Sequence, residues 1–107
     1  MKQQTHIIRL TDENGSLVNF ERWAHKKTQT CIEKMVELYA TYPGIYKRDI
    51  DKAATITCYS TPDQGPETPV WTVTKQEFLR MVEKKVAVLQ AIYEQRLAAL
   101  RAAAELN

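Results

Sequence analysis

The first part of the chain alternates between apolar and polar positions in the way that a β-hairpin requires. Two stretches rich in β-branched and aromatic residues, 5–10 and 17–23, flank a turn segment that contains an Asn-Gly pair. Asn-Gly tolerates the positive φ values of tight hairpin turns. Because successive side chains of a strand point to opposite faces, we expect Val18 and Phe20 to face the core together.

A helical period replaces this alternation after the hairpin. From about His25 to Thr41, apolar residues recur at steps of three and four, which places them on one side of a helix. We expect the helix to end at Pro43 and Gly44, because proline disfavours helical geometry at the residue before it and glycine accepts a left-handed turn. The polar segment 45–52 is then expected to be a connection.

The second half of the chain repeats the order of strands and helix. Segments 54–60 and 70–74 are rich in Thr, Ile, Val, Tyr and Trp, which favours strands, and a loop with three prolines separates them. A last helix is expected to begin at Thr74, which forms a capping box with Glu77. No Gly or Pro interrupts the chain from there onward.

This order, β-β-α-β-β-α, predicts an α+β fold: a four-stranded sheet with helices on one face and a long C-terminal helix. The length of 107 residues predicts one domain, 1–107, with the helix from about 75 to 106 partly projecting. About 30 helical residues span about 45 Å, more than the diameter of so small a domain. The expected core residues are Phe20, Ile32, Met35, Val36, Ile56, Val73, Phe78, Val82 and Leu89.

The composition is that of a globular protein, with 44% hydrophobic and 26% charged residues and a net charge of +2. We find neither a dense basic run, nor a signal peptide, nor an apolar stretch long enough to cross a bilayer. Two cysteines are too few for a disulfide scaffold. We therefore expect a cytoplasmic protein that does not contact membranes.

The candidate catalytic residues do not show the spacing that catalysis or metal binding requires. His6 and His25 are expected to be surface or strand-edge histidines, and Cys31 and Cys58 to pack in the core as small hydrophobes. The spacing of these four residues lacks the paired ligands of a zinc site, and the isolated glycines form no phosphate-binding loop. We expect no enzyme activity, no catalytic residue, no cofactor and no metal.

Two short basic clusters with aromatic residues are candidate contacts for nucleic acid or for a protein partner. Lys and Arg bind phosphates, and single-stranded bases stack on aromatic rings. The first cluster is Arg22, Trp23, Lys26 and Lys27, and the second is Tyr46, Lys47 and Arg48. A small nucleic-acid-binding accessory protein is therefore the alternative function.

The long last helix suggests the favoured function, which is binding through protein–protein contact. Its apolar stripe continues beyond the length that a domain of this size can cover, so we expect it to pack on another copy and form a homodimer. The predicted self-association residues are Leu89, Ile92, Tyr93, Leu97 and Leu100. A helix that bends back or frays after about Arg96 is the structural alternative, and a foreign protein of unknown identity is the alternative partner.

The first 40 residues also carry a resemblance. The segment His6–Leu10, the Asn-Gly turn, the segment Leu17–Trp23 and the following Lys26-Lys27-Thr28 resemble small accessory proteins of bacterial phages and mobile elements, which include anti-CRISPR-like inhibitors. The resemblance implies an inhibitor of a bacterial defence system that acts by contact. Proteins of this kind that mimic DNA are strongly acidic, so a chain of charge +2 is expected to block a protein surface instead.

Overall fold

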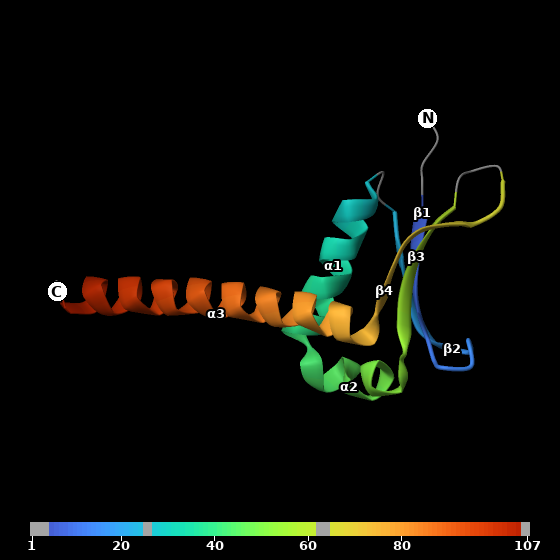
Figure 1. Ribbon diagram of the computed structural model, residues 1–107. Coiled ribbons are helices and arrows are strands. Elements are labelled where there is room, and N and C mark those ends of the chain that lie inside the picture. The colour runs from blue at the N-terminus through green and yellow to red at the C-terminus, as the bar shows by residue number, and fades with distance from the viewer. Residues whose placement is uncertain (1–4, 25–26, 62–64, 106–107) are drawn as a thin grey trace.

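The computed structural model describes residues 5–24, 27–61 and 65–105 of the chain. Four strands and three helices follow one another in the order β-β-α-α-β-β-α, and all three helices lie on one side of the sheet (Figure 1). The α+β class, the four-stranded sheet and the long C-terminal helix are confirmed. The elements are β1 (Thr5–Thr11), β2 (Leu17–Trp23), α1 (Thr28–Thr41), α2 (Pro43–Lys52), β3 (Thr55–Thr61), β4 (Thr68–Thr74) and α3 (Lys75–Glu105).

The two hairpins join through their first strands. The sheet order is β2-β1-β3-β4, and every neighbouring pair is antiparallel. On β1, His6, Ile8 and Leu10 face the helices and are almost completely buried. The hairpin turn is formed as expected: Gly15 has a φ of 81°, and the Asp12 carboxylate accepts hydrogen bonds from the backbone N–H groups of Asn14 and Ser16.

The prediction that Val18 and Phe20 share the core face is wrong. Val18 packs against the core, whereas Phe20 is 46% exposed. A register shift explains the difference, because Leu10 pairs with Asn19 and Thr11 pairs with Leu17, which leaves Val18 as a bulge. A bulge adds one residue to a strand and turns the following side chains to the other face.

The hydrophobic core lies between the helices and the central strands β1 and β3. Of the expected core residues, Ile32, Met35, Val36, Ile56 and Phe78 are buried, while Val73, Val82 and Leu89 are partly buried. Cys31 and Cys58 are buried among them, as predicted. Packing of this kind stabilises a small domain mainly by removing apolar surface from water.

The connection expected at 45–52 is a helix. Pro43 occupies the first turn of α2, where a missing backbone N–H costs nothing, so α1 does end before Pro43 as predicted. Gly44 lies inside α2 and has no positive φ, so the expected left-handed turn at this residue is wrong. One buried residue, Ile50, anchors α2 to the core, and Asn19 of β2 donates a hydrogen bond to Asp49 (2.7 Å).

Helix α3 is capped as predicted and projects from the domain. The Glu77 N–H donates to the Thr74 hydroxyl, and the Thr74 N–H donates to the Glu77 carboxylate, each at 3.2 Å. Phe78 is buried in the first turn, but almost every residue after Gln90 is exposed. The molecule is therefore 61 Å long and only 19 Å thick, and α3 extends away from the sheet (Figure 1).

The buried face of α1 provides a direct test of this packing. Ile32→Ala should lower the free energy of unfolding by about 2–5 kcal/mol, through lost transfer free energy and a residual cavity. Ile32 is 2% exposed, whereas Ile45 is 70% exposed, so Ile45→Ala is a matched control that should change stability little. Urea denaturation followed by circular dichroism measures both, and equal midpoints for the two variants would contradict the assignment of the core.

Candidate functional site

The first predicted basic cluster is divided between the two faces of the sheet. Arg22 is exposed on the face without helices, while Trp23, its neighbour on β2, packs against the core and lies under the Lys34 ammonium group (6.0 Å to the ring centroid). Lys27 is exposed at the start of α1, and Lys26 lies outside the described residues. Arg22, Trp23 and Lys27, the described members of the cluster, therefore present no single basic surface.

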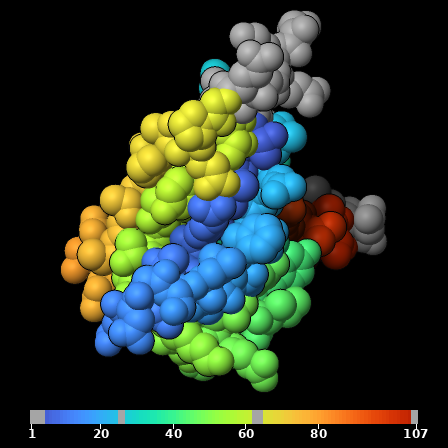
Figure 2. Space-filling view, turned by 90° about the vertical axis from the view of Figure 1, so that its right-hand side faces the viewer, coloured from blue at the N-terminus to red at the C-terminus, as the bar shows by residue number. Residues whose placement is uncertain are grey.

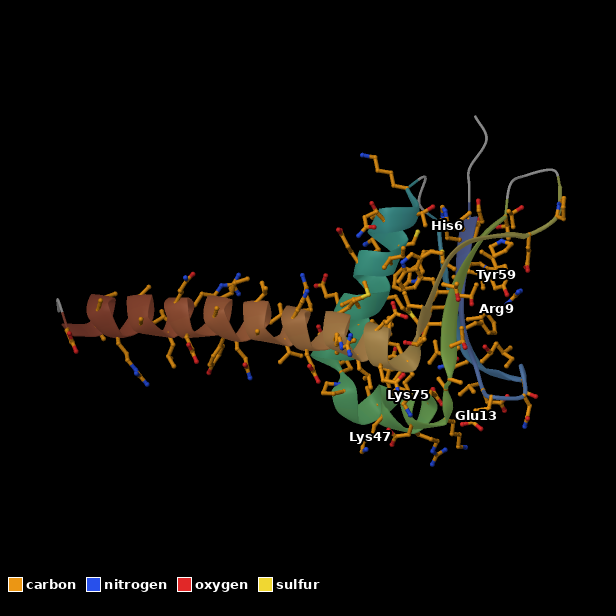
Figure 3. The ribbon with its side chains drawn as sticks, in the orientation of Figure 1. His6, Arg9, Glu13, Lys47, Tyr59 and Lys75 are labelled. Carbon is orange, nitrogen blue, oxygen red and sulfur yellow. The ribbon has the colours of Figure 1, made fainter. Side chains whose placement is uncertain are left out.

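The second predicted cluster lies on α2, at the other end of the sheet. Tyr46 stacks on Tyr39 with ring centroids 4.6 Å apart, and Lys47 forms an ion pair with Asp51 (3.0 Å). Figure 3 shows Lys47 near one end of the sheet and His6, the β1 neighbour of Trp23, near the other. The structure thus separates the two clusters that the alternative function would need together.

The face of the sheet that carries no helix brings together residues that the sequence analysis did not select. Figure 2 looks onto this face and shows the four strands side by side with no helix over them. We call it the bare face. Arg9 is central on it: its guanidinium lies over the Tyr59 ring (4.7 Å) and donates two hydrogen bonds of 2.8 Å to the Glu67 carboxylate. Figure 3 shows Arg9 and Tyr59 side by side on this face.

The bare face is partly covered by its own side chains. Ile7, between Arg22 on β2 and Tyr59 on β3, is only 6% exposed although no helix covers it. Phe20, which pairs with Arg9, remains 46% exposed. Two guanidinium groups and two aromatic rings on one face of the sheet are suited to contact an anionic, partly aromatic ligand. Only the strand register aligns them, so no sequence motif marks them.

The prediction of a surface or strand-edge position for His6 is wrong. His6 is 1% exposed, and its Nε2 atom lies 3.1 Å from the Thr28 hydroxyl, so it joins the start of β1 to the start of α1. The second histidine, His25, lies outside the described residues. His6 thus makes a buried structural contact between β1 and α1.

The two cysteines are shielded from solvent. Both side chains have no exposed surface, and burial, together with the neighbouring Cys31, raises the pKa of the Cys58 thiol to about 11. A thiol acts as a nucleophile only as the thiolate, so this environment suppresses its reactivity. Within the described residues, no group of three His, Cys, Asp or Glu side chains could hold a metal ion.

The second candidate surface is the apolar stripe of α3. Leu89 and Leu97 are partly buried, while Ile92, Tyr93 and Leu100 are 38%, 66% and 68% exposed. The stripe begins in a groove of ≈ 730 Å³ between α3 and the junction of α1 and α2. The residues that line the groove include Ala40, Thr41 and Pro43 on one side and Val86, Leu89, Tyr93 and Leu97 on the other.

The structure therefore brings the predicted self-association residues together on one side of a straight helix. The expected alternative, a helix that bends back or frays after Arg96, does not occur, because α3 is continuous to Glu105. In the described part of the chain, no helix is long and apolar enough to span a membrane. Comparisons with family models, curated proteins and solved structures find no match to this chain.

Burial of the thiols predicts that they do not react in the folded protein. At pH 8, a disulfide reagent such as Ellman's reagent should leave Cys31 and Cys58 unmodified and should label both at once in denaturant. Raising the pH to 9 should not start the labelling of Cys58 either, because the pKa of its thiol is raised to about 11 and the thiol keeps its proton. Rapid labelling of two thiols in the native protein would contradict their burial.

Proposed function

We propose that this chain is a non-enzymatic binding protein that acts by protein–protein contact and self-associates through α3. One observation carries the proposal: the apolar stripe of α3 continues past the domain, so Ile92, Tyr93 and Leu100 are exposed on a part of the helix that no other described element covers. Exposed apolar patches of this kind mark interaction sites in soluble proteins.

The energetics support a dimer of moderate affinity. At about 25 cal/mol per Å², burial of a few hundred Å² of apolar surface per chain supplies several kcal/mol. Association costs only part of the total that the two chains gain, through lost translational, rotational and side-chain freedom. The surplus corresponds to a dissociation constant in the micromolar range.

The finer form of the proposal is an inhibitor of a bacterial defence system, encoded by a phage or mobile element and acting in the cytoplasm. It is supported by the resemblance of the first 40 residues to accessory proteins of that kind. The net charge of +2 favours contact with a protein surface over imitation of a DNA duplex. Capture of partners from a bacterial lysate, with and without nuclease treatment, distinguishes a protein target from one bridged by nucleic acid.

Self-association is tested by changing the stripe. Light scattering at tens of micromolar should report a dimer for the intact chain. The double variant Ile92→Glu with Leu97→Glu, and a chain cut after Arg96, should each be a folded monomer. Ala91→Glu with Ala98→Glu adds the same charge on the opposite side of the helix and should leave the dimer intact. A monomer for the intact chain would overturn self-association.

The bare face supports a second candidate function, which is binding of single-stranded nucleic acid. Arg9 and Arg22 lie on this face with Phe20 and Tyr59, and guanidinium groups with aromatic rings are the chemistry that binds phosphates and stacks bases. Against it, the Arg9 guanidinium is already engaged by Glu67. Protein contact therefore remains the favoured function.

An oligonucleotide titration tests this second candidate. If the bare face binds single strands, Arg22→Glu with Phe20→Ala should weaken binding, whereas Arg48→Glu on α2 should leave it unchanged. Two phosphate contacts predict a slope of about −1.4 for log affinity against log salt. Equal losses of affinity in the two variants would mean that the oligonucleotide binds at another surface. If the unchanged protein retains no oligonucleotide at about 50 mM salt, the bare face is excluded as a binding site.

A further inference from the structure

The charges beside the apolar stripe of α3 are complementary to those of a second copy. Glu94 and Arg101 are seven residues apart, which is close to two helical turns, so both lie on the same flank of the stripe next to Leu97. Both side chains are exposed, and neither forms an ion pair with any described residue. Each therefore carries a charge that no described residue of the same chain neutralises.

When two copies pair about a twofold axis perpendicular to α3, each of these two charges meets an opposite charge on the partner. In an antiparallel helix pair, the same flank of each helix meets its counterpart, as in antiparallel coiled coils. If the axis passes between Leu97 and Ala98, Glu94 lies opposite the partner's Arg101, and Arg101 lies opposite the partner's Glu94. In a parallel pair, this flank would face the other flank of the partner and the two Glu94–Arg101 contacts could not form.

The sizes of the stripe residues fit the same register. Tyr93 would lie between the partner's Leu100 and the partner's Ala104, where the small alanine leaves room for the ring. Leu97 would meet the partner's Leu97 at the axis. Large residues packed into spaces left by small ones give the interdigitation that helix pairs require.

The groove at the base of α3 also favours the antiparallel arrangement. The junction of α1 and α2 stands beside Leu89 and Tyr93 and leaves a groove lined by Ala40 and Pro43. In the antiparallel register, the alanine-rich end of the partner helix, around the partner's Ala104, reaches this groove. In a parallel pair, both domains lie at the same end of the helices, and two such junctions would meet there.

We propose, on the basis of the self-association proposed above, that two copies pair through antiparallel α3 helices about an axis between Leu97 and Ala98. The resulting dimer is a rod with a sheet at each end. Because α3 leaves the domain on the side opposite the bare face, the two bare faces point outward, away from each other (Figure 1). The α3 helices alone separate the two sheets by about 70 Å. The dimer is thus a bivalent bridge that presents two identical faces.

Charge reversal tests the register. Glu94→Arg and Arg101→Glu should each weaken dimerisation by about tenfold, since each places like charges together at two symmetric positions. The double variant Glu94→Arg with Arg101→Glu restores opposite charges and should dimerise within about threefold of the unchanged chain. Sedimentation equilibrium measures all four dissociation constants, and a double variant as weak as the two singles combined would overturn the register.

Cysteine cross-linking tests the direction of the helices. Under mild oxidation, Glu94→Cys with Arg101→Cys should give a covalent dimer, and Ala104→Cys should not, because its two copies would lie about 20 Å apart. The native thiols of Cys31 and Cys58 are buried and should not compete. An efficient Ala104→Cys dimer would overturn the antiparallel pairing and leave self-association standing, whereas a monomeric unchanged chain would overturn both.

Discussion

The packing of α1 and the first turns of α3 against β1 and β3 is the interaction on which the rest of the structure depends. It buries Ile8, Leu10 and Ile56 of the strands against Ile32, Met35 and Phe78 of the helices. A chain of 107 residues has material for one such core. Since all three helices pack on one side of the sheet, no described helix covers the other side, and no described element packs along α3 beyond the end of α1.

These two consequences give the molecule two surfaces of different chemistry, facing opposite directions. The bare face carries guanidinium groups beside aromatic rings, and one of these charges is already neutralised within the chain, because Glu67 forms an ion pair with Arg9. The stripe of α3 is apolar and exposed, and only burial against another molecule removes it from water. This asymmetry is why protein contact through α3 is the function that we favour, and why an antiparallel pair would turn the bare faces outward.

Local patterns predicted much of the fold because their causes lie within a few residues. The Asn-Gly turn, the Thr74–Glu77 capping box and the apolar stripes of α1 and α3 each depend on spacing alone. Helix α2 was missed because its composition is polar and it contributes one fully buried residue, Ile50. His6 was misplaced because nothing near it in sequence shows that Thr28 would lie 3.1 Å from its ring.

The sequence by itself determined the α+β class, the capped and uninterrupted α3, and the residues of its apolar stripe, since periodicity and caps are local properties. Only the tertiary structure decided which residues share a face of the sheet. The bulge at Val18 moved Phe20 to the bare face, and the pairing of β1 with β3 brought Arg9 to Tyr59 across nearly 50 residues. Both depend on strand register, which is fixed by contacts between strands and cannot be inferred from the spacing of residues within either strand.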